Sequence, residues 1–233
     1  MLRKLSSLFI IVTLTASSTS FATDGDWEWL FHGKKRDLKK WEPKPKYARK
    51  PNARPSLITG EWKVEDGELV HVPSGGYLRT KEKFANFILE LEVKYTPGAN
   101  SGIYIWSPEH DTMNRGLEFQ LLDSYGQPAD IHAFGAFYDA QAPTENAALP
   151  NTEWQHMRIE VRNPRILVSV NHKLVNDVNI DRWTEIGKNP DGTENKYSHA
   201  LGSRPRNGRI SIQDHNNVLR FRNIRIKRLP DSD

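Results

Sequence analysis

Cysteine is absent from this chain of 233 residues. A chain without cysteine has no disulfide, no thiolate ligand for a metal and no N-terminal cysteine to carry a lipid, so burial of apolar residues must stabilise the fold. Long apolar runs are also missing, because the most apolar stretch, residues 8–16, is too short to span a bilayer. The sequence therefore excludes a disulfide-stapled scaffold and a lipoprotein, and we expect no stable membrane insertion.

Several catalytic signatures are missing as well. The chain has no G-x-S-x-G, no H-E-x-x-H, no P-loop and no dinucleotide-binding fingerprint, and its eight histidines lack the spacing of metal ligands. We therefore expect neither a metal nor a cofactor. Charge of one sign does not dominate, since 33 basic residues face 29 acidic ones and the net charge is +4. Such a balance argues against a nucleic-acid partner.

The N-terminus has the parts of a signal peptide. A basic start precedes the apolar residues 8–16, and a polar run ends in Ser-Phe-Ala at Ala22, with small residues where signal peptidase requires them. We predict cleavage after Ala22, which makes residues 1–22 a signal peptide and residues 23–233 a single exported domain, periplasmic or secreted. An uncleaved membrane anchor at the N-terminus is the alternative.

The chain does contain segments in which apolar and polar residues alternate. Residues 86–95, NFILELEVKY, place apolar side chains on one face and charged side chains on the other, as a strand with one wet face does. Residues 153–162 alternate in the same way, and residues 165–170, 208–214 and 218–229 are further strand candidates separated by turn signals. No long segment has the 3.6-residue period of a helix. The fold class we predict is therefore all-β, a two-sheet antiparallel β-sandwich.

The strand predicted at residues 218–229 changes the face of its apolar residues part-way along. Leu219 and Phe221 share one parity. Ile224 and Ile226 share the other, so a β-bulge near Asn223 would bring all four side chains to one face.

Two polar stretches are predicted to be loops. Residues 42–56 hold four prolines and five basic residues, which is typical of an extended surface loop. A basic lip that receives an anionic partner is the alternative for this stretch. Residues 181–201 are predicted to form one helical turn and a long loop.

The sequence GLEFQLLD at 116–123 puts polar side chains into an otherwise apolar strand. Glu118 and Gln120 are two residues apart and share a face. Asp123 has the other parity, so we predict a bulge between residues 120 and 123 that aligns all three. Carboxylates in a row on the concave face of a sandwich suit acid–base chemistry on a glycosidic bond. A solvent-facing polar row without a function is the alternative.

Four further segments offer ligands for a sugar. Asn100, in the glycine-flanked GANSG, can donate to hydroxyl groups and accept from them. Tyr138 lies in GAFYDAQAP, and Arg79, just before a strand, is a candidate partner for an anionic oxygen. His215, in IQDHNN, becomes a candidate if it meets Glu118 across the sheet. The alternatives are an ordinary turn around Asn100 and a structural role for the histidine.

These motifs together resemble the 3-keto-disaccharide hydrolase domain family. The resemblance covers residues 27–229 and is carried by GGYLRTKEKFANFILELEVKYTPGANSGIYIW, GLEFQLLD, GAFYDAQAP, EWQHMRIEVRNPRILVSVN and GRISIQDHNNVLRFRNIRIKRL. Family members are exported bacterial proteins with a concanavalin A-like jelly-roll sandwich. The resemblance implies that fold here, together with an oxidised glycoside or disaccharide as the carbohydrate partner.

The resemblance also implies a reaction. A ketone at C3 of a glycoside acidifies the proton at C2, a base removes that proton, and the resulting enolate expels the aglycone from C1 by β-elimination before water adds back. The implied catalytic residues are Glu118 and His215, as base and acid in either order, with Asp123 orienting them or sharing protons.

The same reaction needs groups that bind the sugar oxygens and the enolate. The residues implied for this binding are Arg79, Asn100, Gln120 and Tyr138. Two other interpretations remain open, because a fold does not fix a function. One is a non-catalytic carbohydrate-binding module on the same fold, and the other is a structural surface protein. Only an enzyme would release the aglycone from a 3-keto-glycoside.

Overall fold

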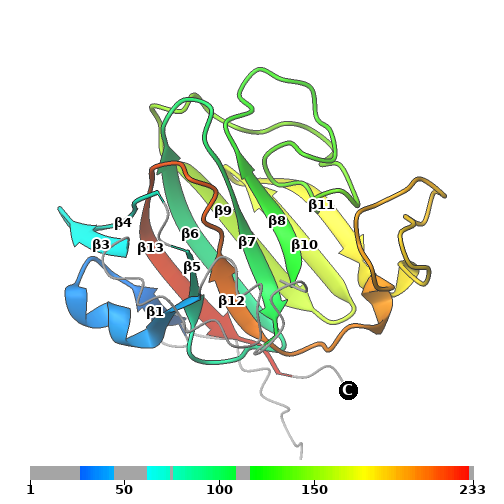
Figure 1. Cartoon of the computed structure of the whole chain (residues 1–233), viewed down its shortest axis with the longest axis horizontal. Coiled ribbons are helices and arrows are strands. Elements are labelled where there is room, and N and C mark those ends of the chain that lie inside the picture. The colour runs from blue at the N-terminus through cyan, green and yellow to red at the C-terminus, as the bar shows by residue number, and fades with distance from the viewer. Residues whose placement is uncertain (1–26, 45–61, 74–75, 109–115, 231–233) are drawn as a thin grey trace, which may run out of the picture.

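Two antiparallel β-sheets pack face to face as a sandwich (Figure 1). The computed structural model describes residues 27–44, 62–73, 76–108 and 116–230. The predicted signal peptide at 1–22 and most of the predicted loop at 42–56 lie outside the described residues.

The larger sheet has eight strands, in the order β11-β10-β9-β6-β13-β4-β3, and β1 also pairs with β13. Their bounds are Trp27–Phe31 (β1), Trp62–Glu65 (β3), Glu68–His71 (β4), Phe87–Tyr95 (β6), Gln155–Arg162 (β9), Arg165–Val170 (β10), Lys173–Asn179 (β11) and Leu219–Arg228 (β13).

The smaller sheet has five strands in the order β2-β5-β12-β7-β8, so neighbours in the sheet are often far apart in the sequence. Their bounds are Trp41–Lys44 (β2), Tyr77–Thr80 (β5), Asn100–Ser107 (β7), Leu117–Leu122 (β8) and Arg209–Ile212 (β12). Three short 3-10 helices complete the described elements: η2 (Lys35–Lys40), η3 (Ile180–Arg182) and η4 (Leu201–Ser203). The predicted all-β class, a two-sheet antiparallel sandwich of the concanavalin A-like jelly-roll type, is confirmed.

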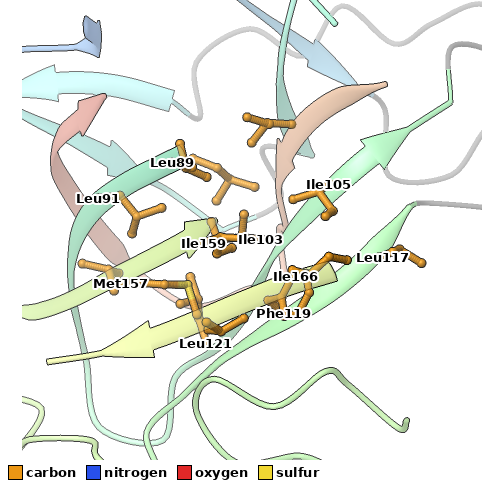
Figure 2. Close-up of a cluster of buried hydrophobic side chains, with 14 of the residues drawn as sticks. Leu89, Leu91, Ile103, Ile105, Leu117, Phe119, Leu121, Met157, Ile159 and Ile166 are labelled. Carbon is orange, nitrogen blue, oxygen red and sulfur yellow. The ribbon is translucent and has the colours of Figure 1, made fainter. Parts of the chain in front are cut away.

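Every second side chain along the strands points inward, and these apolar side chains fill the space between the sheets. Leu89 and Leu91 of β6 and Ile159 of β9 point inward from the larger sheet. Ile103 of β7 and Phe119 of β8 meet them from the smaller sheet, and all five side chains are at most 2% exposed (Figure 2). Burying a side chain of this size stabilises the fold by roughly 1.5–3 kcal/mol, so the two sheets are held together mainly by this core.

The predicted bulge near Asn223 is confirmed. The register of β13 against β6 shifts between Arg222 and Arg225, and Asn223 has a left-handed φ of 52°. The side chains on both sides of the shift, at Phe221 and Ile224, are therefore both buried. The one extra residue at the bulge switches which positions face inward, from odd-numbered to even-numbered residues, so the apolar side chains on both sides of it stay in the core.

The outer faces of the two sheets differ. On the larger sheet, outward-facing charges neutralise each other, as where Glu90 accepts hydrogen bonds from Arg158 at 3.0 Å and from Arg225 at 2.7 Å. On the smaller sheet, Glu42 pairs with Arg79 near one edge, whereas Glu118 on the strand at the other edge has mostly uncharged side chains around it. No helix in the described part of the chain is long and apolar enough to cross a membrane.

Candidate active site

The outward-facing side chains of the smaller sheet form rows across its strands. Glu118 of β8 lies opposite Tyr104 of β7, and Tyr104 lies opposite Ser211 of β12. Beside β8, the segment around Tyr138 continues the sheet irregularly, because the Tyr138 backbone N–H donates to the Glu118 carbonyl at 3.0 Å. The regular alternation of β8 therefore aims Glu118 outward, and its neighbours in the sheet place two tyrosines beside it.

The Glu118 side chain is buried although it points away from the core. Only 3% of the residue is exposed. Its Oε1 accepts a hydrogen bond from Nε2 of Gln213 at 3.0 Å, and its Oε2 accepts one from Nζ of Lys196 at 3.0 Å. Gln213 also donates to the Tyr104 hydroxyl at 2.8 Å. Each carboxylate oxygen therefore accepts one hydrogen bond, which limits the orientations that Glu118 can adopt.

Gly102 makes room for this carboxylate. It lies opposite Gln120 in the sheet and one strand away from Gln213, whose backbone N–H donates to the Gly102 carbonyl at 2.9 Å. A Cβ atom on Gly102 would lie 2.9 Å from Oε1 of Glu118, closer than such contacts normally come. The glycine therefore leaves space for Glu118 in its present position, and a larger residue there would have to displace that side chain.

A polar cavity of about 370 Å³ lies in front of Glu118. Its size is within the range of small-ligand sites, about 300–1,000 Å³. The residues that line it are Tyr77, Asn100, Tyr104, Glu118, Tyr138, Lys196, Gln213, Asp214, His215 and Asn216. Hydroxyl, amide and charged groups thus surround the space, as recognition of a sugar requires.

Tyr138 and Lys196 close one side of the cavity. Nζ of Lys196 lies 3.6 Å from the centroid of the Tyr138 ring, a cation–π contact. Burial, followed by the negative charges of Glu118 and Asp139, raises the pKa of the Tyr138 hydroxyl above its usual value. The Tyr138 hydroxyl therefore keeps its proton at neutral pH and can donate it in a hydrogen bond.

The opposite side is held by a buried pair. Asp214 accepts hydrogen bonds from the backbone N–H of Gly76 at 3.0 Å and of Asn216 at 2.9 Å, and it faces the His71 imidazole. Although burial acts against it, the hydrogen bonds from His71, Asn216 and Gly76 lower the pKa of the Asp214 carboxyl. These contacts fix the turn that carries His215.

Four of the predicted site residues come together at this cavity. Glu118, Asn100, Tyr138 and His215 all line it, and His215 lies on its exposed rim. Gln120 lies next to them, where its Nε2 donates to Oδ1 of Asn100 at 3.2 Å. Gln120 is buried and does not line the cavity itself. It supports the cavity wall by its hydrogen bond to Asn100.

The predicted bulge between residues 120 and 123 is wrong. The pairing of β7 with β8 runs without a register shift from Leu117 to Leu122, and the Asp123 N–H continues it by donating to the Ala99 carbonyl at 3.0 Å. Asp123 therefore keeps the other parity and lies away from the cavity. Its Oδ2 accepts from the Gly98 N–H at 2.8 Å and from Asn151 at 2.9 Å. These contacts hold a turn, and we no longer assign Asp123 a catalytic role.

Arg79 also lies away from the cavity. It faces outward in the same row as Glu118, but Ser211 and Tyr104 stand between them. Three strand spacings of about 4.8 Å therefore separate the two backbones. Nε of Arg79 donates to Glu42 of β2 at 2.7 Å, which satisfies that charge at the edge of the sheet. The substrate-binding role predicted for Arg79 has no support in this arrangement.

Sequence reasoning missed Lys196 and Tyr104. Lys196 comes from the polar stretch that was predicted only as a loop, 78 residues after Glu118. Tyr104 is part of an apolar strand pattern, in which its outward parity was the one available signal. No cluster of three His, Asp or Glu side chains that could hold a metal occurs in the part of the chain that the structure describes.

Comparisons to known proteins agree with the fold and show the family. Residues 26–227 match the 3-keto-alpha-glucoside-1,2-lyase-like domain family, and the chain belongs to this family. A curated relative, the 3-keto-disaccharide hydrolase of Bacteroides thetaiotaomicron, is 26% identical over 73% of this chain and 71% of its own length.

Solved structures show the same fold. A crystal structure of a candidate glycosyl hydrolase from Parabacteroides distasonis is 27% identical, with a TM-score of 0.71 over 87% of this chain and 99% of its own. β-Agarase B from Zobellia galactanivorans, 14% identical, superposes with a TM-score of 0.50 over 89% of this chain and 96% of its own, which shows a shared fold alone.

Proposed function

We propose that this protein is a carbohydrate hydrolase that cleaves the glycosidic bond of 3-keto-glycosides, including 3-keto-disaccharides. The observation that carries the proposal is Glu118, a buried carboxylate that faces a polar cavity and accepts one hydrogen bond on each of its oxygens. Membership of the family and the activity named for the Bacteroides relative support the same substrate class.

In this proposal Glu118 is the base. It takes the proton from C2, the C2–H electron pair forms C2=C3, and the carbonyl pair moves onto the C3 oxygen as an enolate. The enolate pair then restores the carbonyl, C1=C2 forms, and the bond between C1 and the aglycone oxygen breaks. Water finally adds its hydroxyl to C1 and its proton to C2, so that the net reaction is hydrolysis.

His215 is the proposed acid that gives a proton to the leaving oxygen. It lies on the exposed rim of the cavity, where the aglycone of a bound glycoside would reach solvent. Glu118 lies in the buried part, where the carbon acid must be held. An acid on the outside and a base on the inside match the positions of the two bonds that must be broken.

Uncharged groups around the base are proposed to bind the sugar. The hydroxyls of Tyr104 and Tyr138 and the amide of Asn100 can each exchange hydrogen bonds with sugar hydroxyls. Gln213 has a different role, since its Nε2 already bridges Glu118 and Tyr104 and so orients the base.

The test compares a chromogenic 3-keto-glucoside with the same unoxidised glucoside. We expect cleavage of the first, accompanied by exchange of the C2 proton with solvent deuterium, and little or no cleavage of the second, because only the ketone acidifies C2–H. Equal cleavage of both substrates would indicate a conventional glycosidase. Saturable sugar binding without cleavage would indicate a carbohydrate-binding module. Either result would overturn the proposal.

A further inference from the structure

We infer that Lys196 binds the C3 oxygen of the substrate and thereby makes the site selective for oxidised sugars. In the structure without substrate its Nζ lies 3.0 Å from Oε2 of Glu118. A C3 ketone that enters the cavity would take this cation over as its charge partner when it becomes an enolate. The inference rests on the function proposed above and names the group that stabilises its intermediate.

Charge singles out Lys196 for this role. Among the described residues that line the cavity, it is the one lysine or arginine. Removing the C2 proton puts a full negative charge on the C3 oxygen, which must be stabilised where water is partly excluded. The neutral amides and hydroxyls of the cavity can donate hydrogen bonds but bring no compensating charge, and His215 is assigned to the leaving oxygen, so Lys196 is the cation left for the C3 oxygen.

The position of Lys196 suits a group that changes partner. Its side chain is 47% exposed, whereas that of Glu118 is 4% exposed, so the pair straddles the boundary between cavity and protein. The Tyr138 ring, 3.6 Å from Nζ, supports the cation from one side as it moves. Lys196 thus pairs with the Glu118 carboxylate in the resting protein, and it shifts to the C3 oxygen as proton transfer moves the negative charge from Glu118 to the enolate.

The loop does not need this side chain to stay in place. The Lys196 backbone N–H donates to the Asp139 carboxylate, and the Tyr197 hydroxyl donates to the Tyr138 carbonyl at 2.8 Å. Further along, the Asn195 N–H donates to the Gly187 carbonyl at 2.8 Å. Because these contacts already fix the backbone, the ion pair with Glu118 is available for chemistry.

Selectivity follows from the difference between a ketone and a hydroxyl. The C3 hydroxyl of an unoxidised sugar does not acquire negative charge, so it competes poorly with the Glu118 carboxylate for Lys196. In that complex the base stays paired with the cation. Lys196 therefore stays on Glu118 with an unoxidised sugar and follows the negative charge to the C3 oxygen with an oxidised one.

The test uses a 3-keto sugar that has no aglycone at C1, so that exchange of its C2 proton in deuterium oxide reports proton removal without any leaving group. Lys196→Met keeps the length of the side chain and removes the charge, and Lys196→Arg keeps the charge. The matched control is Lys188→Met, because Lys188 lies in the same loop, pairs with Glu185 at 3.2 Å and does not line the cavity.

We expect Lys196→Met to slow C2 exchange about 10²–10³-fold, as the loss of an oxyanion donor does, and to slow aglycone release from a 3-keto-glycoside by a similar factor. Lys196→Arg should recover about tenfold or more of that loss, and Lys188→Met should match the wild type. Thermal unfolding of each protein shows whether it is folded, and Lys196→Gln takes the place of Lys196→Met if that variant is not.

Two results would overturn the inference. One is unchanged exchange in a folded Lys196→Met protein. The other is loss of aglycone release with normal exchange, which would assign Lys196 to the leaving group instead. A wild-type protein that neither exchanges the C2 proton nor cleaves would contradict the proposed function itself, and the two failures are thereby distinguished.

Discussion

Nε2 of His71 lies 3.2 Å from Oδ1 of Asp214, and both side chains are completely buried. The other ring nitrogen of His71 lies 2.6 Å from the Asn217 carbonyl oxygen, and the Asn217 side chain accepts from the Asn100 N–H at 3.1 Å. This chain of contacts joins the larger sheet to the turn that follows β12 and to the start of β7. It therefore holds two walls of the cavity, at His215 and at Asn100, in a fixed relation.

The free energy of unfolding should depend on the Asp214 carboxyl at acid pH. Its pKa is lowered in the folded protein, so the folded state binds this proton less readily than the unfolded state. The stabilisation is complete above the unfolded-state pKa of about 3.9. It should be lost as the pH falls below about 4 toward the folded-state pKa, and denaturant unfolding at several pH values measures it.

Asp214→Asn should flatten that acid dependence and cost roughly 1–3 kcal/mol at neutral pH, because an amide is a poorer acceptor for the buried His71 ring and the two backbone N–H groups. Asp177→Asn is the control, since Asp177 also has a lowered pKa, through its hydrogen bond to Arg165, but is 46% exposed. An exposed pair contributes about 0–1 kcal/mol. Equal effects of the two substitutions would contradict the buried pair as the cause.

Asp123→Asn should lower stability and leave the chemistry intact. The Asp123 carboxylate accepts from the Gly98 N–H and from Asn151, and it does not line the cavity. Replacing one charged acceptor should cost about 1 kcal/mol in the free energy of unfolding, with kcat/KM close to that of the wild type. Denaturant unfolding and the 3-keto-glucoside assay measure the two quantities, and a large loss of kcat/KM in a stable protein would return Asp123 to the mechanism.

The two bulge predictions show what parity can and cannot decide. Near Asn223, apolar residues on both parities must reach the core, because exposing Ile224 or Phe221 would cost burial energy. That demand made the bulge predictable. At residues 120–123 no such demand exists, because Asp123 is polar and can end a strand on either face. Aligning Asp123 with Glu118 would have served only a shared site, and the strand pairing continues through Asp123 without a shift.

The strand pattern predicted the fold and placed Glu118, but it could not predict the whole site. Period-two alternation gives the face of each side chain without naming its neighbours across the sheet. Gln213 and Glu118 meet because β12, β7 and β8 are adjacent, an order that the chain does not follow. Lys196 reaches the site from a polar loop whose composition carries no sign of its contact with Glu118. Asn100, Tyr138 and His215 could be found because the resemblance pointed to their segments.

Gly102→Ala should damage catalysis more than folding. The added Cβ would lie 2.9 Å from Oε1 of Glu118, and no left-handed φ makes alanine unfavourable there. Glu118 must then move, and a misplacement of about 1 Å can cost on the order of 10²-fold in rate. The measurement is kcat on the 3-keto-glucoside beside thermal unfolding.

A matched glycine separates the two effects. Gly126 has a left-handed φ of 72° and nothing within 4 Å of an added Cβ. Gly126→Ala should therefore cost about 1 kcal/mol of stability or more and leave kcat unchanged. The opposite pattern, with Gly102→Ala unstable but fully active, would show that Glu118 needs no fixed position.

His215→Gln should slow cleavage according to the leaving group. An acid is needed when the aglycone is a sugar alcohol, but hardly when it is 4-nitrophenol, which leaves readily as an anion. We expect a loss of about 10²-fold or more with an alkyl or sugar aglycone, and a much smaller loss with 4-nitrophenol. Exchange of the C2 proton should continue, because Glu118 still removes it. Equal losses with both aglycones would assign His215 another role.

Glu118→Gln should abolish turnover and preserve the fold. Glutamine has nearly the same shape and can still accept a hydrogen bond, but it does not take up a proton at neutral pH. Loss of a general base typically costs about 10²–10⁴-fold in rate, and both C2 exchange and aglycone release should fall together because proton removal precedes elimination. Glu160→Gln is the matched control, since Glu160 is also a strand glutamate, accepts from Arg158 and Arg162, and lies on the other sheet. Wild-type turnover in a Glu118→Gln protein would remove this residue from the mechanism and make His215 the next candidate for the base.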